Sequence, residues 1–448
     1  MTSIQAMAAH VAGARARDLD AVSRDALKRH VVDSVAALIA GAHTGEGRAL
    51  ARLLPHGDGV ATAVARRAAT ARLTEIDDIH LPSCTTPGSV VVTTALTLAA
   101  AQPRPSAQGF ADAVAVGYEA MTRLGQALDG PKVLYRGVWP TCFTAPFTAA
   151  AVASRIAGLD AARTAHALGI ALAEATPGPG RPGPPLPARW LVLGEGAREG
   201  ALAARAAAEG FTGDDSLIDG NWLKGAHGLE AKPAAMTDGL GKDSVLTRLS
   251  IKPFCSAKQA VAAVSALRAI MGRGVAAGSI RSVKVLVPEA YRVMIGHPAS
   301  AGNRSSSILS VAYQLAIAAH DPGQLYDVAR ERIATSGPVI EFANKVTVAA
   351  DDTLAAHYPA RWPARIEVET ASGTLSEEVV DAPGDPGRPL DLAAVRDKFH
   401  RCIDPLIGAG EVDAWIAAAE GSVADDGALF ELGRRVAAHE AKLAASAS

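Results

Sequence analysis

Residues 282–287 read SVKVLV. This short segment decides the fold class, because it belongs to a strand-rich part of the chain that helical patterns flank on both sides. Valine stands at every second position, which is the period of a strand with one buried face. The same alternation recurs at 345–348, 364–369 and 374–379, whereas residues 305–319 carry a helical pattern. The sequence therefore predicts an α+β unit with four strands in this part of the chain.

Working outward from this unit, the pattern is helical on both sides. Residues 26–42 (ALKRHVVDSVAALIAGA) place apolar side chains at steps of three and four, and similar Ala-rich segments follow them. After the last strand the helical pattern returns and continues to the end. We therefore expect a mainly α fold with an inserted α+β domain. The two chain ends, residues 1–247 and 391–448, would form a large all-helical bundle domain, and residues 248–390 the smaller α+β domain.

The composition argues against several classes of function. The chain has 448 residues, of which 49% are hydrophobic, and its net charge is -2. No stripe of Lys and Arg stands out, so we expect no nucleic-acid partner. The four cysteines have no CxxC spacing, and no apolar run is long enough to span a bilayer. A signal-peptide pattern is also lacking, which predicts a cytoplasmic protein without a membrane partner.

The densest group of ionisable residues is the segment 75–80, EIDDIH, which precedes CTTPG at 84–88. Three carboxylates and an imidazole within six residues favour acid–base catalysis, because crowding shifts pKa values toward the working range. Two other interpretations stay open. Asp and His could ligate a metal ion, or the segment could be a helix end with solvated carboxylates.

Two lysines stand at the start of the α+β unit. The segment 252–258 reads KPFCSAK and opens a helix that we predict at 257–269. Lys252 and Lys258 near a helix N-terminus would form a cationic spot that suits carboxylates. The alternative is that both are ordinary surface lysines.

Arg198 and Tyr313 are two further candidates. Arg198 lies in the segment 194–200, GEGAREG. Small neighbours leave its guanidinium room to reach a carboxylate, although the residue could equally lie on a seam between helices. Tyr313 is the lone aromatic residue of an aliphatic helical segment, a position typical of a core tyrosine with a satisfied hydroxyl.

Taken in order, these segments resemble the 2-methylcitrate dehydratase / cis-aconitate decarboxylase family (MmgE/PrpD), which includes iminodisuccinate epimerase-like members. The resemblance runs from about residue 18 to residue 399, and the order of the segments carries it rather than any single motif. The segments are 33–41 DSVAALIAG, 77–80 DDIH ahead of a Pro-Gly, 158–160 GLD, 166–171 HALGIA, 200–204 GALAA, 210–213 GFTG, 252–254 KPF and 395–399 VRDKF.

The resemblance implies a helical domain, an α+β lid domain and a homodimer, with the active site between the domains. It also implies cofactor-free dehydration, decarboxylation or epimerisation of a small di- or tricarboxylate. In all three reactions negative charge develops beside a carboxylate, so fixed cations must stabilise it while an acid and a base move protons. The expected partner is therefore a small carboxylate.

The resemblance also assigns roles to individual residues of the acidic segment and the lid. Asp77 and Asp78 match paired aspartates of the family, and His80 matches the histidine of a DDxH pattern. Glu75 stands where relatives have a catalytic aspartate. Lys252 matches the lid lysine.

Two more positions follow from the same comparison of patterns. Tyr313 matches a lid tyrosine that follows a serine three residues earlier, which is Ser310 here. Arg198 replaces a lysine or arginine and keeps the positive charge.

The chain departs from the family pattern at three positions where relatives carry histidine. Thr86, Trp139 and Lys258 stand at these positions, and we expect the first two to contact the substrate. Losing the imidazoles removes groups that exchange protons near neutral pH. We therefore expect a substrate acid other than 2-methylcitrate or cis-aconitate, or a different proton route through Lys258, Tyr313 or His80.

The sequence thus predicts a lyase, with an isomerase as second choice, that needs no cofactor or metal. It would act on a small carboxylate or keto/enol substrate through an enolate-like intermediate in a cationic cleft. Arg198 and Lys252 would hold the negative charge, and Lys258, in a cationic pocket, would be the base. The remaining members of the expected catalytic set are Glu75, Asp78, His80 and Tyr313. Two alternatives stay open: a non-enzymatic carboxylate-binding or scaffold protein, and a metal-dependent hydrolase built on the acidic segment.

Overall fold

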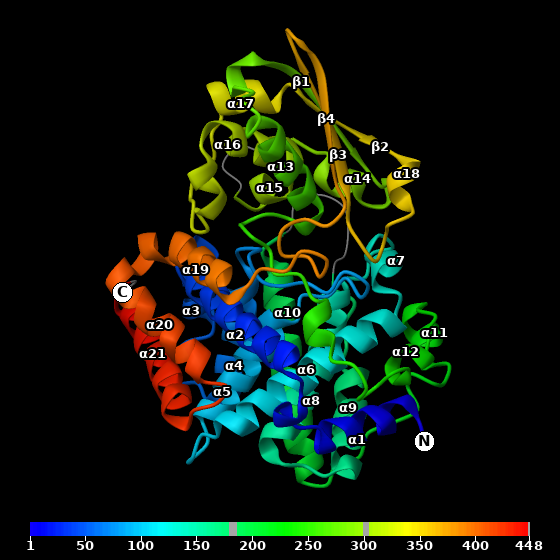
Figure 1. Ribbon diagram of the computed structural model, residues 1–448. Helices are drawn as coiled ribbons and strands as arrows, with labels where there is room; N and C mark the ends of the chain where they lie inside the picture. Colours follow the sequence, from blue (N-terminus) through cyan, green and yellow to red (C-terminus); the bar gives the residue numbers. More distant parts are fainter. Residues whose placement is uncertain (179–185, 299–303, 447–448) are drawn as a thin grey trace.

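The computed structural model describes residues 1–178, 186–298 and 304–446. Most of these residues are helical, and one four-stranded mixed sheet lies at one end of the molecule (Figure 1). The mainly α character that we predicted is therefore confirmed. Among the described residues, no helix combines the length and apolar character that a membrane crossing requires.

Helices form the part of the chain that precedes the sheet. Several of them begin at a polar residue that accepts a hydrogen bond from the first turn: Asp20, Ser106 and Asp160 each bond the backbone N–H three residues later. The helices are α1 Ser3–Gly13, η1 Ala16–Asp18, α2 Ala21–Ala42, α3 Gly45–Leu53, α4 Val60–Arg72, α5 Gly88–Ala100, α6 Ala107–Ala127, α7 Gly130–Leu134, α8 Pro140–Ala157, α9 Ala161–Ala173, α10 Ala188–Ala208, α11 Trp222–His227, α12 Ala234–Thr237 and η2 Val245–Arg248.

The sheet contains the four predicted strands in the order β2-β1-β3-β4. They are β1 Ile280–Val287, β2 Val346–Ala350, β3 Ala364–Thr370 and β4 Gly373–Val379. β1 pairs with β2 in parallel, and the other neighbours are antiparallel. Along β3 the apolar residues at every second position are buried, so the alternation in the sequence marks the face that packs on helices.

The helices beside the sheet are short except for α13, which packs on β3 and β4 and against α16. They are α13 Lys258–Met271, η3 Ala277–Ser279, α14 Glu289–Ile295, α15 Arg304–Leu309, α16 Val311–His320, η4 Pro322–Tyr326, α17 Pro338–Ala343 and α18 Asp352–Ala355. The single helix predicted for residues 305–319 is in fact two. Ser310 is extended, and its side chain accepts a hydrogen bond from Tyr313 N, so the serine starts a second helix.

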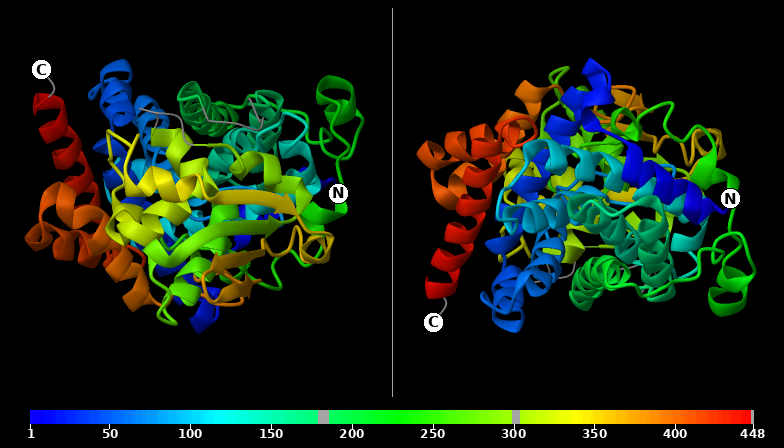
Figure 2. Two further views of the ribbon diagram at one scale, coloured as in Figure 1. Left: turned by 90° about the horizontal axis from the view of Figure 1, so that it is seen from above. Right: turned by 90° about the horizontal axis from the view of Figure 1, so that it is seen from below.

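The last three helices return to the beginning of the chain. They are α19 Leu392–Ile407, α20 Ala409–Gly421 and α21 Asp426–Ser446. α19 and α20 pack on α2, and α21 packs on α3 and α5. Figure 2 shows from two sides that these three helices lie along one side of the helical part and do not cover the sheet.

All four cysteines lie in the described residues, and they are free and buried. Burial raises the pKa of Cys84, Cys142 and Cys402 to about 12. Their thiols are therefore protonated at neutral pH.

Candidate active site

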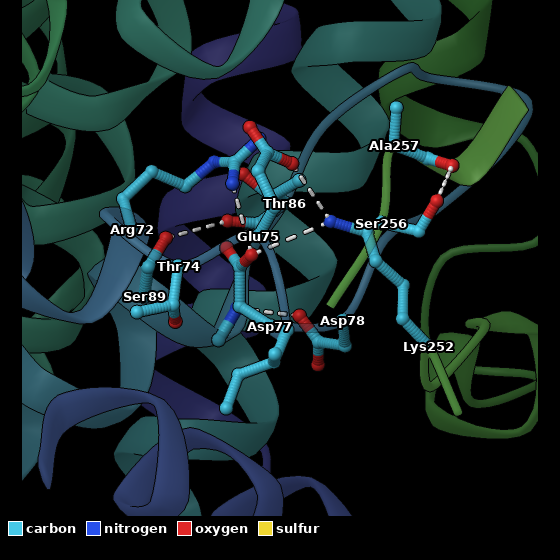
Figure 3. A network of polar contacts seen from close by, with 12 residues as sticks. Arg72, Thr74, Glu75, Asp77, Asp78, Thr86, Ser89, Lys252, Ser256 and Ala257 are labelled. Carbon is cyan, nitrogen blue, oxygen red and sulfur yellow. Dashed lines mark hydrogen bonds and ion pairs between the residues drawn. The ribbon is translucent and has the colours of Figure 1, made fainter. Parts of the chain in front are cut away.

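Two segments far apart in the sequence lie side by side where the helical part meets the sheet-bearing part. The first connects α4 to α5, and the second leads from η2 into α13. Ile79 and Ser250 exchange backbone hydrogen bonds of 2.9 and 2.8 Å, which fix the two segments against each other. As a result Lys252 points at the carboxylates of the first segment (Figure 3).

The contact produces a buried cluster of two cations and two carboxyl groups. Arg72, the last residue of α4, places Nη2 2.8 Å from Glu75 Oε1 and Nη1 3.0 Å from Asp77 Oδ1. Lys252 Nζ lies 3.0 Å from Glu75 Oε2 and 3.5 Å from Asp77 Oδ1. All four side chains are buried. The two open alternatives, solvated carboxylates and surface lysines, are therefore wrong for these residues.

The two carboxyl groups of the cluster differ in proton affinity although both are buried. Burial alone would raise the pKa of Glu75, but the charges of Arg72 and Lys252 and their hydrogen bonds outweigh it and lower that pKa. For Asp77 burial prevails over the same two cations, and the neighbouring carboxylates of Glu75 and Asp78 add to it, so its pKa is raised. Because one pair of cations serves both groups, they titrate as a unit.

Backbone strain accompanies this cluster. Glu75 and Cys84 have φ of 59° and 55°, in the left-handed region that side chains other than glycine rarely adopt. Both residues line one small cavity, which Arg72 and Lys252 also line. Strain of this kind persists only where the surrounding contacts enforce it, and it concentrates at functional sites.

Lys258, the first residue of α13, brings a second ammonium group to the cavity. Lys258 is buried, and its Nζ lies 2.8 Å from Asp385 Oδ1 and 3.0 Å from Oδ2. Ser250 Oγ donates to Oδ1 at 2.7 Å, and Ala382 N donates to Oδ2 at 2.9 Å. The expected purely cationic surroundings of Lys258 are thus wrong, because a fully bonded carboxylate faces it.

The cavity enclosed by these groups has a volume of about 30 Å³. Its walls come from both segments and from the sheet-bearing part, and they combine charged, hydroxyl and aromatic side chains. Its lining residues are Arg72, Glu75, Ile79, Cys84, Thr86, Leu134, Trp139, Thr141, Lys252, Ala257, Lys258, Gln259, Met294, Leu309 and Trp362.

Thr86 and Trp139 line this cavity, as expected of substrate-contacting positions. Both Thr86 N and Thr86 Oγ1 bond to Thr141 Oγ1, at 3.1 and 3.3 Å. The guanidinium of Arg189 lies 3.9 Å from the centroid of the Trp139 ring, which is the geometry of a cation–π contact. These contacts fix one wall.

Asp78 lies behind the cavity and does not line it. Its Oδ1 accepts from Gly88 N at 2.8 Å, and its Oδ2 accepts from Tyr118 Oη at 2.6 Å and lies 2.8 Å from His30 Nδ1. Burial raises its pKa, but these three contacts outweigh burial and lower it. A Cβ at Gly88 would lie 2.9 Å from Asp78 Oδ1, so only glycine allows this approach. The geometry gives Asp78 a role in joining α2, α5 and α6.

His80 also lies outside the cavity lining. Its Nδ1 is 2.9 Å from Ser83 Oγ, and burial lowers its pKa to about 3, with the charge of Arg248 adding to the effect. The ring is therefore neutral at physiological pH, and the structure does not bring it to the proton route that we expected.

The structure does not bring Tyr313 or Arg198 to the cavity either. Tyr313 is buried in α16, and its hydroxyl accepts a hydrogen bond of 2.9 Å from Ala334 N. The side chain of Arg198 is 44% exposed on α10 and pairs with Glu195 and Glu199. Of the two predicted holders of negative charge, only Lys252 faces the cavity.

Three residues at the site were not predicted from the sequence: Arg72, Trp362 and Asp385. Arg72 carried a usable signal, because it precedes Glu75 by three residues, a spacing at which side chains of a helix meet. Asp385 lies in a segment whose Gly and Pro residues indicate only a turn. Nothing local links it to Lys258, 127 residues earlier.

Two models of one protein family match most of the chain. Residues 5–234 match the MmgE/PrpD N-terminal domain, and residues 254–422 match the MmgE/PrpD C-terminal domain. The chain therefore belongs to the MmgE/PrpD family, which includes lyases such as 2-methylcitrate dehydratase. A comparison with curated proteins found no match.

Proposed function

We propose that the protein is a cofactor-independent lyase or isomerase that acts on a small carboxylic acid through an enolate-like intermediate. The observation that carries this proposal is the convergence of two buried ammonium groups, Lys252 and Lys258, on one cavity with the carboxylate of Glu75. Fixed cations in a site that excludes water stabilise the negative charge that develops beside a carboxylate.

The Glu75–Asp77 pair is the base in this proposal. Glu75 faces the cavity, whereas Asp77 has the higher proton affinity, and Arg72 and Lys252 contact both. When one of the two carboxyl groups is protonated, the higher proton affinity of Asp77 places the proton there, and Glu75 stays charged. Glu75 would thus accept the proton removed from the substrate.

Lys258 takes a different part from the one that its sequence position predicts. The buried carboxylate of Asp385 stabilises the charged ammonium group, which has no lone pair for a proton. Lys258 would therefore bind the carboxylate or enolate oxygen through hydrogen bonds from its ammonium group and would not be the base. Thr86 and Trp139 would shape the opposite wall.

Access to the site requires movement of its walls. A cavity of about 30 Å³ accommodates a water molecule but no dicarboxylic acid. Glu75 and Thr86 come from the helical part, and Lys258 and Trp362 come from the sheet-bearing part. Separation of these two sides would admit the substrate, and their return would exclude water.

The proposal extends to domains and assembly. The packing of α19 and α20 on α2 supports a helical domain of residues 1–247 and 391–448, with residues 248–390 as a lid. The family resemblance supports a homodimer. Light scattering would contradict this last part by giving the mass of a single chain.

The test is proton exchange. The protein is incubated in deuterated buffer with a panel of small mono-, di- and tricarboxylic acids, and proton NMR follows loss of the α-proton signal and formation of product. Exchange or turnover should occur with at least one acid and disappear in Glu75→Gln, while Arg198→Ala, which changes an exposed cation, should behave as wild type. Absence of exchange with every acid at high protein concentration would refute the proposal.

A second candidate is a carboxylate-binding protein without catalysis. It is favoured by one observation: His80, the histidine of the acidic segment, is neutral and lies outside the cavity lining. In that case the acids would raise the melting temperature of the protein without forming product.

A further inference from the structure

The buried charges around the cavity are already balanced. Each of its three lining cations lies within 3.0 Å of a buried carboxylate oxygen. These cations are Arg72, Lys252 and Lys258, and the carboxyl groups that pair with them are Glu75, Asp77 and Asp385. Among these six groups, no positive charge is left over for an incoming carboxylate.

A carboxylate that enters this cavity therefore adds an uncompensated negative charge at a buried place. Proteins respond to such a charge by changing the protonation of a nearby group, because an unpaired buried ion is very unfavourable. The question is which group takes the proton.

Asp77 is the group with room for a proton. Its Oδ1 faces Arg72 and Lys252, whereas its Oδ2 is buried and has no hydrogen-bond partner among the described residues. Burial raises the pKa of Asp77 toward neutrality, and the nearby carboxyl groups of Glu75 and Asp78 add to this effect. A further negative charge in the cavity raises it more.

The neighbouring groups are less suited to this part. Asp385 accepts from three donors, and Asp78 is held by Gly88, Tyr118 and His30. Lys398 donates hydrogen bonds to the backbone carbonyl of Ile76 and to Asp33, so its ammonium group is bonded there and not to Asp77.

We propose that a small carboxylate binds in this cavity together with one proton from solvent, which the Asp77 carboxylate takes up. The site then gains no net charge on binding. A single carboxylate is the charge that one proton balances, so the site should prefer a monoanion, and a second carboxylate on the ligand would require a further proton. The inference rests on the proposed function for the class of ligand.

Calorimetry tests the proposal with the full-length protein. Acetate, monomethyl succinate and succinate are titrated near neutral pH in PIPES and in imidazole, two buffers with different enthalpies of ionisation. The difference in binding heat between the buffers gives the number of protons taken up. We expect about one proton for each monoanion, and an affinity that falls about tenfold per pH unit above neutrality, as linkage requires for one proton.

Three variants locate the proton. Asp77→Asn removes the carboxylate that would accept the proton, so this variant should bind the probes without proton uptake. Asp385→Asn leaves one cation unbalanced, so it should bind the same probes with reduced uptake. Asp33→Asn is the matched control, because Asp33 is also buried, pairs with one lysine and has an oxygen without a hydrogen bond, yet that lysine, Lys398, does not line the cavity. Its proton uptake should equal that of wild type.

The outcomes separate this proposal from the one on which it rests. Binding with the same heat in both buffers would overturn proton uptake and leave the proposed function intact. The absence of binding by every probe would overturn both. Uptake that persists undiminished in Asp77→Asn would move the proton elsewhere and refute the assignment to Asp77.

Discussion

Lys258 Nζ lies 2.8 Å from Asp385 Oδ1, although 127 residues separate the two in sequence. Both side chains are at most 2% exposed, so this is an ion pair removed from water. The carboxylate fixes the position of the ammonium group at the first turn of α13. It also joins the start of the sheet-bearing part to the loop that leaves it.

Truncating Asp385 should therefore destabilise the protein strongly. Asp385→Ala leaves Lys258 charged and buried without a partner, which costs about 3–5 kcal/mol. Urea unfolding measures the loss. The double variant Lys258→Met/Asp385→Leu, which replaces the pair by apolar side chains, should recover most of it. A loss below about 1 kcal/mol for Asp385→Ala would contradict the burial of the pair.

Gly384 should tolerate no side chain. It has φ of +92°, and a Cβ would lie 1.9 Å from the backbone oxygen of Ile251, whose N–H bonds to Gly384 O. Gly384→Ala should thus displace the segment that carries Lys252. Gly57→Ala is the control, because Gly57 has φ of +99° with open space around it.

The two glycine variants are compared by chemical unfolding. The control should lose about 1–3 kcal/mol from its backbone conformation. Gly384→Ala should lose about 1–3 kcal/mol more, because the backbone must move. Equal losses would show that the contact with Ile251 has no energetic weight.

His80 should make the fold sensitive to acid. In the folded chain its pKa is about 3, whereas the ordinary value is 6.5. Between these two pH values the unfolded chain binds a proton that the folded chain does not, so stability falls as pH decreases from 6.5, by roughly 1.4 kcal/mol per unit. Above pH 6.5 this contribution is constant.

The variant His80→Gln cannot take up that proton, and its unfolding free energy should depend less on pH between about 6.5 and 4. Unfolding curves at several pH values compare it with wild type. Identical slopes for the two proteins would mean that His80 is not buried in its neutral form.

With an acid that the wild-type protein turns over, the turnover numbers of variants should distinguish cavity residues from exposed ones. Lys252→Met should lower the turnover number by roughly a hundredfold or more, because it removes the cation that we propose stabilises developing charge. Arg198→Ala should change it less than about twofold, since a surface ion pair has little effect. A large loss for Arg198→Ala would place the reaction elsewhere.

The helices and strands could be predicted from the sequence because their periodicity is local. Alternating valines predicted β1, and steps of three and four predicted α2. The break at Ser310 could not be predicted in this way, because its side-chain bond to Tyr313 N competes with an otherwise continuous helical pattern.

The candidate site could be predicted only in part. Crowded carboxylates at 75–80 and the two lysines pointed to the right region, since burying so many charges requires partners. Which charges pair depends on contacts between distant segments, such as Ile79 with Ser250. The small residues around Arg198 suggested a site, but the orientation of α10 leaves the arginine exposed.

The burial of all four thiols has a practical consequence. A maleimide dye reacts with thiolates, and the high pKa values of Cys84, Cys142 and Cys402 keep these groups unreactive. A cysteine introduced at the surface would thus be labelled selectively without removing the natural ones. With one dye on α10 and another on β4, energy transfer would measure whether the two halves of the molecule separate, as the proposed entry of a ligand requires.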